Sequence, residues 1–185
     1  MSNVIITDQL FFDQTELDQE RTKSIVADAL DSADDGELFL EYCQSESVSL
    51  DDGRIRNASF DTTQGFGLRA ISGEATGYAH AGNLSEPSLR RAAETVKSVY
   101  AGHNNNSALS PGGTNRKLYI EENPLGQMDF GAKVALLTEI DSYARSKDGR
   151  VQQVMASLSG EWQAVQIIRA DGYCVGDIRP LVRLN

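Results

Sequence analysis

The sequence contains few of the residues that build disulfide frameworks or metal centres. Two cysteines, Cys43 and Cys174, and two histidines, His80 and His103, occur among its 185 residues. The cysteines lie far apart and form no CxxC pair, which excludes a disulfide scaffold and a cysteine zinc site and fits a reducing cytoplasm. The histidines belong to no HExxH motif, so this stretch encodes no zinc-hydrolase centre of that kind. We expect His80, on a strand of small residues, to be a half-buried structural or cavity-lining side chain rather than a metal ligand.

Long apolar runs and basic clusters are also missing. No apolar stretch approaches the ~20 residues that a membrane helix needs, and residues 1–13 lack the basic-then-apolar pattern of a signal peptide. We therefore expect a cytoplasmic protein with no membrane partner. The basic residues are scattered, apart from Arg90-Arg91 and Arg116-Lys117, whereas nucleic-acid binders usually cluster them. This argues against direct nucleic-acid binding.

Acidic residues are concentrated near the N-terminus. Residues 1–52 hold 14 acidic and 2 basic side chains, a net charge of −12. Residues 53–185 hold 13 acidic and 15 basic side chains, a net charge of +2, so the whole chain has a net charge of −10. Two interpretations stay open, namely a solvated face or a docking surface for a basic partner.

Helical periodicity appears in three places. One helix is expected to begin at Thr15 and to stop by Gly36, a second runs from Ser85 to Gly102, and a third spans residues 129–147. A polar loop at residues 103–116 follows the second helix.

Period-two patterns fill most of the rest. Four strands joined by tight turns are expected between Leu38 and Ala81, with separate runs at residues 54–61 and 66–70 and with Asp51-Asp52-Gly53 as a strong turn signal. A short strand at residues 117–122 and three more strands, 151–158, 162–169 and 173–185, complete the pattern. A turn at Ser159-Gly160-Glu161 is expected to separate the first two of these three strands. The prediction is an α+β fold in which a largely antiparallel sheet packs against three main helices, in a single domain at residues 1–185. The last strand pattern still alternates at Asn185, so we expect the natural protein to continue.

Familiar catalytic and nucleotide motifs are absent. There is no GxSxG, and Cys43 and Cys174 are expected to be inert thiols. Gly65-Phe66-Gly67 resembles the start of a dinucleotide fingerprint, but a strand rather than a helix follows it. Two interpretations of the glycines at 65, 67, 73 and 77 remain open: tight packing, or a wall for an extended peptide or partner strand.

Two segments carry a family resemblance. The run QGFGLRAISGEATGYAHAGNLSEPSLRRAAET, residues 64–95, resembles the N-terminal half of the TldD/PmbA family, in its TldD branch. The closing run ADGYCVGDIRPLVRLN, residues 170–185, is similar to the segment just before the C-terminal half of TldD proteins. The opening helix, the Glu41-Tyr42 strand and the 51–54 turn occur in matching order.

The resemblance implies a function for the whole protein. TldD-type proteins are cytoplasmic zinc metallopeptidases that pair with a PmbA/TldE-type subunit and cleave short or unfolded polypeptides; the older label is modulator of DNA gyrase. The family's zinc ligands lie in an HExxxH motif and a downstream cysteine of the C-terminal half. This sequence has no HExxxH, so no catalytic or metal residue is assigned, no cofactor is expected in this stretch, and the catalytic domain is expected to lie beyond it.

The resemblance leaves enclosure of a peptide cavity as the expected role. Arg69 and Tyr78 project from the glycine-spaced strands and are the candidate contacts to substrate or partner, Arg69 through a carboxylate or carbonyl and Tyr78 through apolar side chains. A surface arginine and a core tyrosine are the alternatives. A metal-free PmbA/TldE-type subunit and a stand-alone interaction module also remain open.

Overall fold

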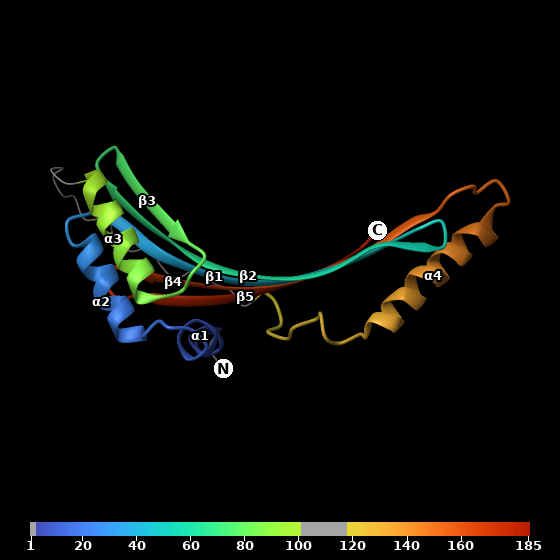
Figure 1. Cartoon of the computed structure of the whole chain (residues 1–185), viewed down its shortest axis with the longest axis horizontal. Coiled ribbons are helices and arrows are strands. Elements are labelled where there is room, and N and C mark those ends of the chain that lie inside the picture. Colours follow the sequence, from blue (N-terminus) through green and yellow to red (C-terminus); the bar gives the residue numbers. More distant parts are fainter. Residues whose placement is uncertain (1–2, 101–117) are drawn as a thin grey trace. The chain divides into compact units, whose positions relative to one another are not determined.

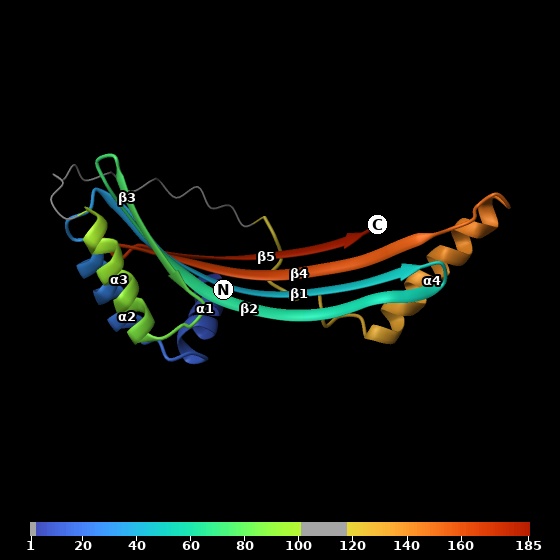
Figure 2. The same ribbon diagram turned by 45° about the horizontal axis from the view of Figure 1, so that its top comes forward.

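A computed structural model describes residues 3–100 and 118–185. The expected loop at 103–116, the helix stop at Gly102 and His103 lie outside these residues. Helices α1 (Asn3–Asp8), η1 (Gln9–Asp13, a π-helix), α2 (Gln19–Leu30), α3 (Glu86–Tyr100) and α4 (Phe130–Lys147) accompany strands β1 (Asp35–Asp51), β2 (Arg54–Ser72), β3 (Ala75–Ala81), β4 (Met155–Arg169) and β5 (Cys174–Leu184). The strands form one antiparallel sheet in the order β3-β2-β1-β4-β5 (Figure 2). The predicted α+β class is confirmed.

The chain divides into two compact units. The first comprises residues 1–42, 63–118 and 164–178, and the second comprises 43–62, 119–163 and 179–185. Four of the strands contribute to both units, and this sharing was not indicated by the sequence. Among the described residues, no helix combines the length and the apolar character needed to cross a membrane.

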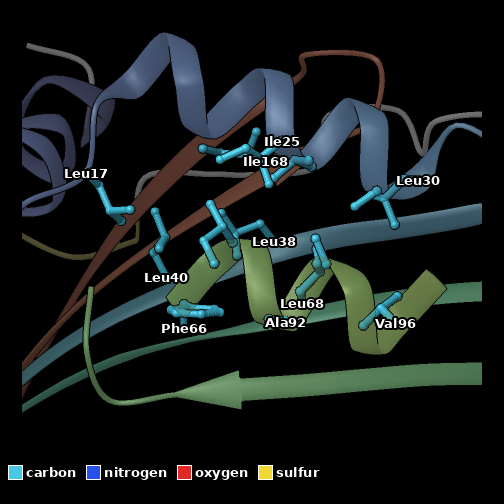
Figure 3. Close-up of a cluster of buried hydrophobic side chains, with 14 of the residues drawn as sticks. Leu17, Ile25, Leu30, Leu38, Leu40, Phe66, Leu68, Ala92, Val96 and Ile168 are labelled. Atoms are coloured by element: carbon cyan, nitrogen blue, oxygen red, sulfur yellow. The ribbon is translucent and has the colours of Figure 1, made fainter. Parts of the chain in front are cut away.

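Helices α2 and α3 cover one face of the sheet in the first unit (Figure 1). α2 begins after Asp18, whose carboxylate accepts the backbone N–H of Arg21 at 2.8 Å. The capping residue is therefore Asp18, and the expected start at Thr15 was three residues too early. Apolar side chains recurring at helical spacing on both helices meet the inward residues of β1, β2 and β4 (Figure 3). The fully or almost fully buried members of this core include Val26, Leu38, Leu40, Leu68, Leu89, Val96 and Ile168.

The N-terminal helices were not predicted. α1 and η1 bring Phe11 into the same core, where its side chain is fully buried. A six-residue helix followed by a single π-helical segment is too short to establish a 3.6-residue period in the sequence.

Helix α4 packs on the sheet of the second unit. Asp129 caps it by accepting the N–H of Ala132 at 2.8 Å, as the expected boundary implied. Its Leu137 is fully buried against a second, smaller cluster on β1 and β4 that contains Val48, Leu50 and Ala156. Helical spacing predicts that Val134, Leu137, Ile140 and Ala144 face inward, and the burial of Leu137 confirms this at the centre of the helix.

Two predicted strand breaks are wrong. The runs expected at 54–61 and 66–70 form the single strand β2, and the turn expected at Ser159-Gly160-Glu161 lies inside the continuous strand β4. A Cβ on Gly160 would stand 2.5 Å from a methyl carbon of Leu125. This glycine therefore makes room for a neighbouring side chain rather than a turn. The described part of the expected 117–122 strand, residues 118–122, is not a strand.

The turn between β1 and β2 is confirmed. Asp52 has φ +52° and Gly53 has φ +75°, the pair of left-handed residues that a two-residue hairpin turn requires. An aspartate and a glycine are among the residues that tolerate this conformation best.

Candidate functional site

The structure brings the two predicted contact residues together. Arg69 on β2 lies directly opposite Tyr78 on β3 in the antiparallel register of these strands. The inward residues Leu68 and Ala70 are fully buried, whereas Arg69 points to the other face of the sheet. The two candidates thus form one cross-strand pair on the face that α2 and α3 do not cover.

Arg69 is held by a carboxylate from the next strand. Its Nε and Nη2 atoms donate to the two oxygens of Glu37 on β1 at 2.8 Å and 3.2 Å. The bidentate hydrogen bonds with Glu37 raise the pKa of Arg69. The side chain is 44 % exposed and that of Glu37 is 19 % exposed. Because Glu37 neutralises it, Arg69 is better suited to donate to a peptide carbonyl than to attract a free carboxylate.

Tyr78 lies over a glycine and beside a histidine. A Cβ on Gly67 would stand 2.7 Å from the Tyr78 hydroxyl, so the ring occupies the space above that glycine. The ring also stacks on His80 with a centroid distance of 5.7 Å and an interplanar angle of 27°. Tyr78 remains 60 % exposed, so the alternative of a core tyrosine is wrong. His80 is exposed rather than half-buried, because its register position opposite Gly67 is on the uncovered face.

The glycines of this sheet are explained by close packing. A Cβ on Gly77 would stand 3.0 Å from the carbonyl oxygen of Val96 on α3, and one on Gly65 would stand 2.9 Å from the carbonyl of Ala81. Gly73 has φ +58° in the β2–β3 turn. Tight packing, the first of the two interpretations, therefore holds at Gly65, Gly67 and Gly77, and a peptide-binding wall stays a prediction.

Neither cysteine is placed as a nucleophile. Burial raises the pKa of the Cys174 thiol, and the side-chain amide of Gln166 donates to its sulfur at 3.0 Å. Cys43 is half-buried on β1. The environment of Cys174 favours the neutral thiol, which is the less reactive form.

The donor set does not fit a zinc centre within residues 3–100 and 118–185. In this part of the chain no three His, Cys, Asp or Glu side chains come close enough together to hold a metal ion. A structural or catalytic zinc site needs at least three protein ligands. No step of a hydrolytic mechanism is therefore assigned to these residues.

A buried ion pair in the second unit was missed by sequence reasoning. Lys133 on α4 donates from Nζ to both carboxylate oxygens of Glu46 on β1, each at 2.7 Å, and to the carbonyl of Leu125 at 2.8 Å. The signal available in the sequence was helical spacing, because Lys133 stands one turn before the inward Leu137. A cavity of about 450 Å³ lies beside the pair, and its lining includes Leu125, Met128 and Leu136.

Comparison with known proteins places this fold in a family. Residues 36–99 match the model described as PmbA/TldA metallopeptidase domain 1, and residues 123–185 match the model of the PmbA/TldA metallopeptidase central domain. The first matched segment includes both Arg69 and Tyr78, and the second includes α4. The chain belongs to the PmbA/TldD metallopeptidase family.

Individual relatives agree with this assignment. A metalloprotease TldD homolog from Haemophilus influenzae is 40 % identical over 156 residues, which cover 82 % of this chain and 32 % of that protein. The chain thus spans about a third of the length of that relative. TldE from Thermococcus kodakarensis has the same fold, with a TM-score of 0.70 at 16 % identity over 88 % of this chain and 37 % of that chain. A candidate modulator of a DNA gyrase from Thermotoga maritima gives a TM-score of 0.72 at 14 % identity over 90 % of this chain and 37 % of its own.

Proposed function

We propose that this chain forms a non-catalytic part of a TldD-type zinc metallopeptidase and helps to enclose the cavity in which unfolded peptides are cleaved. The family match to domain 1 and the central domain carries the proposal. The donor set supports it, because the described residues offer no metal-binding cluster and the hydrolytic zinc would be held outside them.

In this proposal the Arg69–Tyr78 pair faces the peptide. Arg69, fixed by Glu37, donates to a main-chain carbonyl, and the exposed ring of Tyr78 packs on an apolar side chain. Neither contact depends on one particular peptide sequence, which suits a peptidase of unfolded chains. The partner in this proposal is a PmbA/TldE-type subunit, the two proteins form a heterodimer, and the complex works in the cytoplasm.

The proposal is tested in a TldD-type protein that carries this chain, co-expressed with a PmbA/TldE-type subunit. The double variant Arg69→Ala/Tyr78→Ala should slow the cleavage of an unfolded fluorogenic peptide mainly by raising KM, with the complex still assembled. The matched control is Tyr143→Ala/Arg150→Ala, which removes an exposed tyrosine and an exposed arginine from the second unit. If the two double variants show equal kinetics, the Arg69–Tyr78 pair does not contact the peptide.

A further inference from the structure

The part of β2 that belongs to the second unit has an unpaired outer edge. β3 pairs with β2 only from Phe66 to Ser72, and β1 lies on the other side of β2. Among the described residues, Arg54–Thr62 therefore has a neighbouring strand on one side alone. Every residue of this segment is exposed. Its outer edge presents a row of backbone N–H and C=O groups without strand partners.

The opposite edge of the sheet is protected and this one is not. Ser157 on β4 and Asn185, just after β5, exchange two backbone hydrogen bonds of 2.9 Å each. Continuing that register, Pro180 belongs to the alternate set of β5 residues, whose backbone groups face away from β4. Its missing N–H therefore interrupts the outer edge of β5, the usual place for a strand proline. The Arg54–Thr62 segment contains no proline.

An apolar cavity opens beside the unpaired edge. It has a volume of about 460 Å³ and is lined by Ala58 and Phe60 of β2, Val48 of β1, and Met128 and Phe130 at the start of α4, among others. Phe60 and Phe130 are 58 % and 53 % exposed, although aromatic side chains of this size are usually buried. The one ammonium group in the lining, that of Lys133, is already bonded to Glu46 and Leu125. The cavity therefore offers apolar surface and no uncompensated positive charge.

We propose that the outer edge of β2 at Arg54–Thr62 binds an extended polypeptide segment as an added strand, with one large apolar side chain of that segment in the cavity beside Phe60 and Phe130. A row of unpaired backbone N–H and C=O groups is matched by another extended backbone, and an adjacent pocket selects one side chain. β3 already uses the same edge of β2 in this way, through seven antiparallel residue pairs. Arg54 is exposed at the turn end of this edge, so an acidic residue at the matching end of the bound peptide complements its charge. This inference does not depend on the proposed function.

The first test measures binding of a synthetic peptide to the chain. The probe is an acetylated nine-residue peptide of alternating threonine and valine, with phenylalanine at its centre and glutamate near one end. Phe60→Ser should weaken its binding by about tenfold, the loss of one buried aromatic contact, and Ala58→Trp, which fills the cavity, should weaken it as well. The matched control Leu184→Ser removes a side chain of β5 that is 51 % exposed, against 58 % for Phe60, and should leave binding unchanged.

The second test separates strand addition from simple apolar contact. Two further peptides are N-methylated at every second residue, one at the odd-numbered and one at the even-numbered positions. One of them should not bind and the other should bind almost normally, because only one set of N–H groups faces β2. Hydrogen exchange should slow at alternate residues of 54–62 when the peptide binds. The inference fails if the peptide does not bind or if the two methylated peptides bind equally well. It also fails if the protected amides lie on β5, or if the protein alone dimerises through this edge.

Discussion

The single ammonium group of Lys133 on α4 binds both carboxylate oxygens of Glu46 on β1, each at 2.7 Å. The carbonyl of Leu125 takes its third hydrogen bond at 2.8 Å, so the donor capacity of the lysine is fully used. The two side chains are only 9 % and 16 % exposed. The ion pair is therefore a buried and saturated link between helix and sheet.

Removing one partner of this ion pair should destabilise the second unit strongly. Lys133→Met leaves the Glu46 carboxylate buried without its cation, which we expect to lower the free energy of unfolding by about 3 kcal/mol. Urea unfolding followed by tryptophan fluorescence measures this directly. Trp162 is the single tryptophan of the chain and lies in the same unit.

Two controls accompany this measurement. Lys133→Met/Glu46→Leu removes both charges and should recover most of the stability, because no buried charge is left alone. Lys147→Met alters an exposed lysine of the same helix, which lies over Tyr143 at 4.1 Å, and should cost little. If Lys133→Met is as stable as Lys147→Met, the pair does not stabilise the unit.

Two glycines should respond to the same substitution very differently. A Cβ on Gly36 would stand 2.5 Å from the carbonyl oxygen of Arg69, which is backbone of the adjacent strand. Gly36→Ala must therefore push two strands apart, and we expect a loss of about 3 kcal/mol. A Cβ on Gly67 meets the far end of the exposed Tyr78 side chain, which can swing away, so Gly67→Ala should cost less than about 1 kcal/mol.

Thermal unfolding of the two alanine variants checks this contrast. The ring of Tyr78 should also lose its stacking on His80 in Gly67→Ala, which the chemical shifts of the His80 ring protons report. Equal losses of stability at Gly36 and Gly67 would show that the two close contacts are equivalent.

The sequence predicted those elements whose periodicity and end signals agree. α4 was predicted almost to the residue because Asp129 caps it and its apolar residues recur at helical spacing. The continuity of β2 was missed because Arg54–Thr62 is exposed on both faces and lacks the apolar alternation of a half-buried strand. The sequence around Gly160 predicts a turn, because it cannot show that Leu125 occupies the space of the missing Cβ.

The candidate site was predictable to a similar degree. The expected meander placed Arg69 and Tyr78 on neighbouring strands, and the register joins them. The partnership of Arg69 with Glu37 depends on how β1 is aligned with β2, which local pattern does not determine. Lys133 and Glu46 are 87 residues apart, so only tertiary packing pairs them.

Burial should make Cys174 a slow and pH-sensitive thiol. Burial raises its pKa above the ordinary value of 9.0, so the folded protein holds the thiol proton more tightly than the unfolded chain does. In a Cys43→Ser background, Cys174 should react with a thiol reagent at pH 8 more slowly in the folded protein than in urea.

The same shift has a consequence for stability. The pKa of Cys174 is higher in the folded than in the unfolded state. Its contribution to the free energy of unfolding is therefore complete below the ordinary thiol pKa and is lost as the pH rises through the folded-state pKa. The Cys43→Ser protein should therefore lose stability between pH 8 and pH 10 relative to Cys43→Ser/Cys174→Ala. Parallel pH profiles for these two proteins, or equal thiol reactivity in the folded and unfolded states, would contradict the prediction.

Arg145 should fix the β1–β2 turn to α4. Its guanidinium donates to Asp141 one turn earlier on the helix, with Nε to Oδ2 at 3.1 Å, and to Asp52 in the turn. The hydrogen bond to Asp141 is the larger cause and that to Asp52 the smaller, and together they raise the pKa of Arg145. The guanidinium therefore stays charged at any pH of interest. Arg145→Ala should lower the melting temperature and speed hydrogen exchange at residues 51–55. Arg145→Lys should give an intermediate result because an ammonium group cannot reproduce the planar fork.

Arg150 provides the matched control for this prediction. Its side chain is 92 % exposed and pairs with Asp148, only two residues away, so it joins no separate elements. The expected order of melting temperatures is wild type and Arg150→Ala together, then Arg145→Lys, then Arg145→Ala. Added salt should narrow the differences only in part, because the side chain of Asp141 is just 11 % exposed and is less well screened than the surface pair. If Arg145→Ala and Arg150→Ala melt at the same temperature, the turn is held by its own backbone geometry and not by the helix.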